Sequence, residues 1–240
     1  MPRTRWFRAV GALGVVLAAA SASSSVARAA DRCPAGAGGG ATLAEIDPEL
    51  RLHFIDEHLA HTAHRARVWT WSWGIGIGVA TIGNLIPLFF VAPEDRVDWY
   101  VGAATTVVGV VPLLIAPLDV VGDSRSLSAR LALRGPTDDV CVLLADAEAK
   151  LVRDAKNQAD GQRWWLHVGN VVLNTGVGLF LGIGYHHWKA GAFNAIFGSA
   201  IGEAIILTQP TSSIDDLRAY RAGSLDRTPR QVALVYGAAF

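Results

Sequence analysis

A pattern of one amphipathic segment followed by two long apolar runs occurs twice along the chain. Each run is close to the ~20 residues that a helix needs to cross a bilayer. Tryptophans mark the ends of the runs, as in the aromatic belts of membrane proteins. The pattern therefore predicts four transmembrane helices. They cover about Val68–Val91, Trp99–Val121, Trp164–His187 and Ala190–Thr208.

The two halves align without a gap at a spacing of 96 residues, which pairs Arg67 with Arg163 and Gly102 with Gly198. We therefore predict an internal duplication. Its first repeat covers 47–121, a linker covers 122–138, and the second repeat covers 139–215. Because each repeat holds one amphipathic helix and two spans, both enter the membrane from the same side. The predicted fold is an all-α membrane protein with two parallel repeats.

An outer-membrane β-barrel is the alternative, because Val68–Ala80 alternates between large apolar and small or polar residues. The carboxyl end alternates in the same way from Val232 to the terminal Phe240. Helices are favoured because the apolar runs lack the turn residues that separate strands of roughly 10 residues.

The amino-terminal segment has the three regions of a secretory signal peptide, which we place at 1–29. Three arginines precede the apolar run Ala9–Ala20, and small residues follow at 27–29. Residues 30–46 are rich in Gly and Ala and predict a flexible tether. Helix formation is expected to begin at Asp47, because an Asp followed by Pro and Glu favours a helix start.

Two signals disagree on how the chain is oriented in the membrane. The signal peptide places the amphipathic helices and the tail at 216–240 in the periplasm. Arginines are concentrated on that same side, whereas the two short connections contain only Arg96 and Lys189, contrary to the positive-inside rule. We follow the signal peptide and expect a bacterial inner-membrane protein, with the outer membrane as the location if the barrel alternative holds.

Both cysteines, Cys33 and Cys141, lie on the periplasmic side of this topology. An oxidising compartment would permit a disulfide from the tether to the second amphipathic helix. Two unrelated thiols are the alternative, because sequence spacing does not establish proximity.

The composition narrows the function classes. The chain is 51% hydrophobic and 18% charged with zero net charge, and it has no basic face for nucleic acid. No nucleophile elbow, phosphate loop, paired-cysteine knuckle or dinucleotide fingerprint is present. The sequence therefore does not predict an enzyme.

Histidines give the first candidate site, on the first amphipathic helix. His53, Glu57, His61 and His64 share one face, and such groups at helical spacing can bind zinc or copper. A solvated polar face without a cofactor is the favoured interpretation.

The second candidate site lies within the membrane, where Glu203 is the one acidic residue well inside a predicted span. His167, Asn170 and Asn174 form a stripe on the preceding span at a similar depth. Because a charged carboxylate in lipid needs a partner, these four residues are expected to interact. They predict a proton or cation site or, as the favoured hypothesis, polar contacts that fix helix register.

The expected function is a non-catalytic structural or interaction role in the cell envelope. A small transport or proton-coupled unit that uses Glu203 is the first alternative, and a metal-dependent membrane enzyme is the second. The expected partners are the lipid bilayer and either a second copy of the chain or another envelope protein.

Overall fold

The computed structural model describes residues 33–34, 41–115 and 118–226, and describes side chains for all of these except 41–42 and 110–115. Of the described residues, 84% are helical and none is in a strand. The all-α prediction is thus confirmed and the barrel alternative is wrong, because the alternating segment 68–80 lies inside one α-helix. The predicted signal peptide, most of the tether and residues 227–240 lie outside the described residues.

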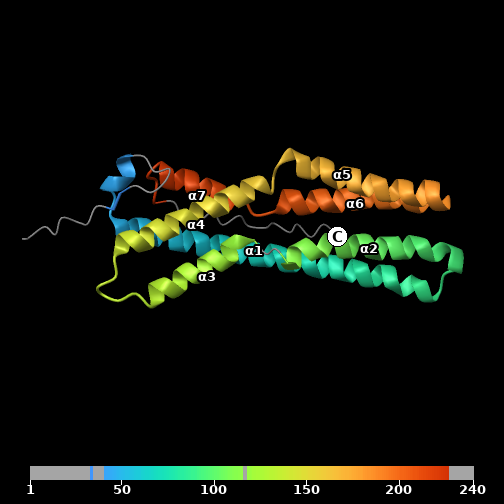
Figure 1. Cartoon of the computed structure of the whole chain (residues 1–240), viewed down its shortest axis with the longest axis horizontal. Helices are drawn as coiled ribbons and strands as arrows, with labels where there is room; N and C mark the ends of the chain where they lie inside the picture. Colours follow the sequence, from blue (N-terminus) through green and yellow to red (C-terminus); the bar gives the residue numbers. More distant parts are fainter. Residues whose placement is uncertain (1–32, 35–40, 116–117, 227–240) are drawn as a thin grey trace, which may run out of the picture. The chain divides into compact units, whose positions relative to one another are not determined.

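Seven α-helices form the described chain (Figure 1). They are α1 (Pro48–Leu85), α2 (Arg96–Ile115), α3 (Asp119–Ala132), α4 (Val140–Asp160), α5 (Trp164–Leu179), α6 (Trp188–Thr208) and α7 (Ser212–Arg221). Short 3₁₀ turns cover Ala41–Glu45, Ile86–Phe89 and Pro93–Asp95, and a π-helical turn at Phe180–Gly184 extends α5.

The start of α1 agrees with the sequence prediction. The Asp47 carboxylate accepts hydrogen bonds from the backbone N–H groups of Glu49 at 2.7 Å and Leu50 at 3.3 Å. These bonds satisfy donors that have no partner inside the helix, and Pro48 occupies the first helical position, where its missing N–H has no cost.

The first amphipathic helix and the first span, which were predicted as two separate elements, form a single helix of 38 residues. In the second half the corresponding helices are separate, because α4 ends at Asp160 and α5 begins at Trp164. Gly161 follows α4, and the residue at its aligned position in the first half is Arg65. Glycine has a much lower helix propensity than arginine, which explains why the helix ends in one half and continues in the other.

Most of the segment at 122–138, which the sequence analysis gives as the linker between the repeats, is helical, because α3 covers Asp119–Ala132. The predicted tail at 216–240 likewise begins inside α7. Val120, Ser124 and Leu127 of α3 are buried at positions i, i+4 and i+7. This helical periodicity was present in the sequence but was short and polar enough to resemble a loop.

The first half of α1 packs with α3, α4 and α7 into one helical bundle (Figure 1). Helix α1 contacts α3, α4 and α7, and α4 contacts α3 and α7. The apolar core of the bundle is formed by side chains from all four helices. It includes Leu52, Ile55 and Leu59 of α1, Val120 and Leu127 of α3, Leu143, Leu144 and Leu151 of α4, and Tyr220 of α7.

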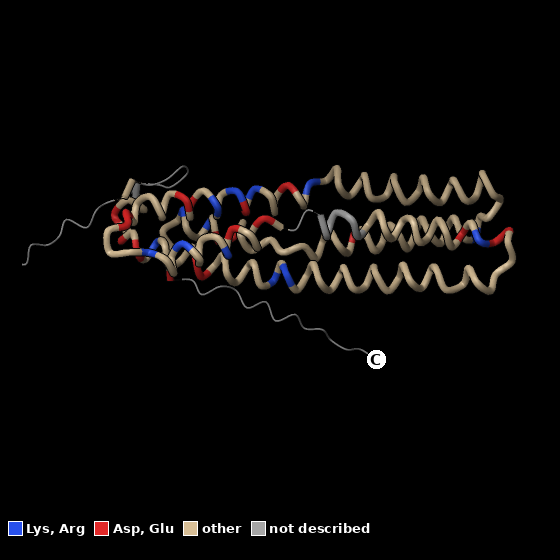
Figure 2. The backbone as a smooth tube through the Cα atoms, turned by 60° about the horizontal axis from the view of Figure 1, so that its bottom comes forward, with Lys and Arg blue, Asp and Glu red and all other residues tan. Residues whose placement is uncertain are grey.

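The remaining helices form two hairpins, in which the second half of α1 packs along α2 and α5 packs along α6. Three described segments are long and apolar enough to cross a membrane: Pro48–Phe89, Trp164–Gly184 and Trp188–Arg221. Helix α2 has 20 residues and is not among them. Figure 2 shows that charged residues gather in the bundle and at the far connections, while the hairpins between them are almost free of charge.

The glycines of the two hairpins differ in what they contact. A Cβ atom on Gly178 would lie 2.6 Å from the Gly191 carbonyl oxygen, so α5 and α6 approach each other backbone to backbone. A Cβ atom on Gly74 or Gly78 of α1 would have no neighbour within 4 Å. Close packing through small residues is therefore a property of the second hairpin at Gly178, and not of the first at Gly74 and Gly78.

We expect Gly178→Ala to lower the free energy of unfolding by about 1–3 kcal/mol, because the added methyl forces the two backbones apart. The matched change Gly78→Ala should be neutral or stabilising by up to ~1 kcal/mol, because alanine favours the helix and meets open space. Thermal unfolding of both variants in detergent measures the difference. Equal stability of the two variants would contradict the packing described here.

Candidate functional site

The structure brings together the four polar residues that the sequence analysis selected in the second hairpin. His167 Nδ1 lies 2.5 Å from Glu203 Oε2. Asn170 donates through Nδ2 to Glu203 Oε1 and to the Ser199 carbonyl, at 2.9 Å in both cases. Asn174 donates to Asn170 Oδ1 at 2.9 Å and does not reach Glu203 directly in the contacts described. The four residues thus form one chain of hydrogen bonds from α5 to α6.

Two glycines of α6 make room for the asparagines of this cluster. A Cβ atom on Gly198 would collide with the Asn174 side chain, and one on Gly202 would collide with the Asn170 side chain. Each asparagine therefore packs directly over glycine backbone. These contacts fix the register of α5 against α6, because a shift along either helix would bring the amides against larger side chains.

The cluster lies on the bundle side of the hairpin and is only partly covered. His167 lies three residues after the start of α5, and Glu203 lies five residues before the end of α6. Each of the two side chains is 29% exposed. Partial exposure near the charged bundle lowers the cost of an ionisable pair, which is greatest at the centre of a bilayer.

Two further polar contacts, which the sequence did not predict, join the two hairpins. At the bundle end, Trp69 and Trp73 donate from their indole N–H groups to Thr208 Oγ1 at 3.1 and 3.0 Å. At the opposite end, His187 Nδ1 lies 2.7 Å from Asp98 Oδ1. No spacing rule could reveal these pairs, because their partners belong to different halves of the chain.

The histidine face of α1 does not assemble into a metal centre in this structure. His53 Nε2 lies 4.0 Å from Glu57 Oε2, and both side chains are exposed. Burial lowers the pKa of His61, and the charge of Arg65 lowers it further. Within the described ranges, no group of three or more His, Cys, Asp or Glu side chains is close enough to hold a metal ion.

A disulfide joins Cys33 to Cys141 at the start of α4. Beside it, the fully buried Arg51 of α1 donates from Nη1 to the Cys33 carbonyl at 3.3 Å and from Nε to the Tyr220 hydroxyl at 2.9 Å. Arg51 also forms an ion pair with Glu148 of α4, and the Tyr220 hydroxyl donates to the same carboxylate. Burial and then the bond to Glu148 raise the pKa of Tyr220, so its hydroxyl keeps its proton.

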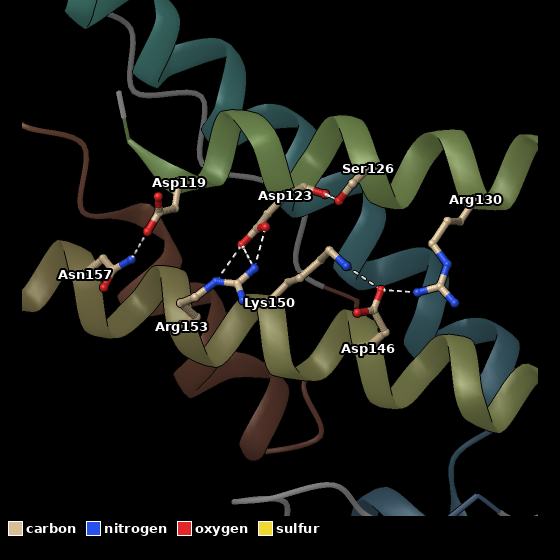
Figure 3. Close-up of polar contacts among 8 residues, drawn as sticks. All are labelled: Asp119, Asp123, Ser126, Arg130, Asp146, Lys150, Arg153 and Asn157. Atoms are coloured by element: carbon tan, nitrogen blue, oxygen red, sulfur yellow. Dashed lines mark hydrogen bonds and ion pairs between the residues drawn. The ribbon is translucent and has the colours of Figure 1, made fainter. Parts of the chain in front are cut away.

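A row of polar contacts joins α3 to α4 along the outer side of the bundle (Figure 3). Asp119 accepts from Asn157, and Asp123 accepts from Arg153, whose Nε lies 3.0 Å away. Further along the row, Asp146 accepts from both Arg130, at 2.8 Å, and Lys150. On the opposite side α7 is joined to α1 by different groups, since His58 Nδ1 lies 2.8 Å from Asp216 and Thr62 Oγ1 lies 2.8 Å from Ser212 Oγ.

The site defined by these contacts is a polar cluster between two apolar helices. Comparison with protein-family models, with curated proteins and with solved structures finds no match to the chain. Any functional assignment therefore depends on the geometry described above.

We expect Glu203→Leu to lower the free energy of unfolding by about 1–3 kcal/mol, because it leaves His167 and Asn170 without their shared acceptor. Glu203→Gln should change it by less than about 1 kcal/mol, because the amide oxygen can still accept from Asn170. Thermal unfolding in detergent measures both variants. Proton flux in proteoliposomes that Glu203→Gln abolishes, with assembly intact, would instead favour a transport role.

Proposed function

We propose that this chain is a multi-pass envelope membrane protein in which four spans anchor one extramembrane bundle with a non-catalytic structural or interaction role. One observation carries the proposal: both halves of the chain contribute to the same bundle, and the hairpins that extend from it expose large apolar side chains. These include Trp71, Ile75, Phe89, Val172 and Ile196. Such side chains are stable in lipid and costly in water.

The path of the chain favours four spans. The first half of α1 and all of α3 pack in the bundle. If the second half of α1 crosses the bilayer, the chain must cross again before α3, and α2 is the helix that lies between them. Thr81 of α1 bonds Thr106 of α2 at 2.8 Å, so the two helices run side by side within the apolar region.

The pattern of helix contacts supports two parallel repeats. Helix α3 packs on α1 as α7 packs on α4, and α7 packs on α1 as α3 packs on α4. Exchanging the two halves of the chain therefore leaves the set of contacts in the bundle unchanged. An axis along the membrane normal that relates the halves accounts for this pattern.

The disulfide supports a periplasmic bundle. Cys33 is 2% exposed and packs in the core of the bundle, so the bond forms part of the folded interior. Disulfides persist in oxidising compartments and are rare in the cytoplasm. This argument agrees with the predicted signal peptide and opposes the arginine distribution. Together with the helical spans, it favours the bacterial inner membrane with the hairpin connections in the cytoplasm.

A cysteine labelling experiment tests this orientation. We expect a membrane-impermeant maleimide to label Glu57→Cys in intact cells, and to label Glu94→Cys in the hairpin connection only after the membrane is permeabilised. Both positions are exposed. The parent protein should react only after reduction, because its two cysteines are bonded. Labelling of Glu94→Cys alone in intact cells would reverse the proposed topology.

An exposed apolar surface at the membrane-distal end of the bundle supports an interaction role. Leu133 after α3 is 85% exposed, and Leu50 of α1 and Val142 of α4 are also exposed. Leu50 and Leu133 each follow or precede a member of the Glu49–Arg134 ion pair, which is 2.5 Å long, and Val142 follows the disulfide-bonded Cys141. Exposed apolar groups beside charged pairs are typical of surfaces that bind another protein.

We expect a photo-crosslinking residue at position 133 to form a discrete adduct in living cells, and the same residue at position 57 to form none. Val142→Glu should reduce the adduct at least about fivefold, because a charge in the contact opposes burial. The mass of the adduct distinguishes a second copy of this chain from another envelope protein. Equal crosslinking from positions 57 and 133 would argue against a specific contact.

A further inference from the structure

Asp154 of α4 is the one residue of the described chain whose buried side-chain oxygens have no hydrogen-bond partner. The residue is 1% exposed and lies in the bundle, outside the apolar hairpins. A buried carboxylate without a donor is strongly unfavourable, whereas the neutral acid is tolerated. Burial first, and then the neighbouring charge of Asp123, raise the pKa of Asp154 to about 8.

The donors that lie within about one helical turn of Asp154 on α4 are bonded to other groups, and the buried Lys150 among them donates to Asp146. Arg153, its neighbour in sequence, directs its guanidinium to Asp123 on α3, and Asn157 donates to Asp119 (Figure 3). The charges from α3 that act on Asp154 are thus two further carboxylates, and Arg153 opposes them only in part.

The described residues of the other helices packed on α4 do not donate a hydrogen bond to Asp154 either. The titratable and charged groups that α1 and α7 place inside the bundle are bonded to one another or to Glu148. They are Arg51 and His58 on α1, and Asp216 and Tyr220 on α7. Asp154 therefore has no hydrogen-bond donor among the described residues, and the positive charge of Arg153 offsets the neighbouring carboxylates only in part.

The aligned position in the first half shows what Asp154 lacks. That position, 96 residues earlier, is His58, which is 3% exposed and bonded to Asp216 of α7. At the α1–α7 contact a buried imidazole thus faces a carboxylate. At the corresponding α4–α3 contact, a buried carboxyl faces another carboxylate, an arrangement that favours a retained proton.

We propose that Asp154 is a proton-binding group that keeps α3 docked on α4 while its carboxyl is neutral, and that its ionisation loosens this contact. Helix α3 directly follows α2, so the docking of α3 decides whether the end of the first hairpin is held by the bundle. The proposed group thereby makes the attachment of that hairpin sensitive to the pH of the compartment that surrounds the bundle.

The direction of the pH effect follows from linkage. The pKa of Asp154 is higher in the folded bundle than its ordinary value of 3.8, so the docked state binds more protons than the undocked state between these values. Docking is therefore strongest at low pH, weakens as the pH rises to about 8, and is constant above that. Within this range, one proton changes the docking equilibrium by about tenfold per pH unit.

Hydrogen exchange of the full-length protein in detergent tests the proposal. We expect the protection factors of residues 119–132 to fall by about tenfold per pH unit between roughly pH 6 and 7.5 in the parent protein. Asp154→Asn should make these factors nearly independent of pH. The matched variant Asp160→Asn, on the same helix at a partly exposed ion pair, should retain the dependence of the parent.

The same pH dependence in Asp154→Asn and in the parent would overturn the proposal. Infrared spectroscopy of the folded parent protein gives a second test that does not depend on the stability of the variant. A protonated carboxyl band at neutral pH that is lost above about pH 9 supports the assignment, and its absence at neutral pH overturns it.

Discussion

The bundle depends on Arg51, whose buried guanidinium contacts three separate parts of the chain. It pairs with Glu148 in the second half, with the Tyr220 hydroxyl near the end of the described chain, and with the carbonyl of the disulfide-bonded Cys33. A buried arginine is stable only when its charge and its donors are satisfied. Each of these partners must therefore reach the same point, which requires α1, α4 and α7 to meet in one register.

The hairpins follow a different physical rule from the bundle. Apolar side chains give little specificity between helices in lipid, because a neighbouring helix is hardly more apolar than the lipid itself. Register in the second hairpin is set instead by close glycine contacts and by asparagines packed over glycine backbone. The first hairpin has one contact of the same kind, since the Asn84 side chain packs over the backbone of Gly102. Polar groups thus determine alignment in both environments, through an ion pair in the bundle and through amides in the hairpins.

The sequence predicted those features that local pattern determines. Helical spans follow from apolar length, the start of α1 follows from Asp47 and Pro48, and the contact of Glu203 with His167 and Asn170 follows from depth counted along two adjacent helices.

Features that depend on distant parts of the chain were not predictable. The partners of Arg51 lie 97 and 169 residues away, and Asp98 meets His187 across two hairpins. The face of α3 was visible as a short periodicity, but its polar composition resembled a linker. The lack of a hydrogen-bond donor at Asp154 could not be predicted from the sequence either, because it depends on which groups the neighbouring side chains bond.

The continuity of α1 gives the two halves of the chain different mechanical properties. A helix of 38 residues is about 57 Å long, and its turns share an unbroken ladder of hydrogen bonds from the bundle into the apolar region. Rotation or tilt of the bundle is therefore transmitted through the rigid helix α1 to the first hairpin. The second half has a joint at Gly161, where the ladder stops between α4 and α5. The first hairpin is therefore joined to the bundle by continuous helix, whereas the second is joined to it through a break between two helices.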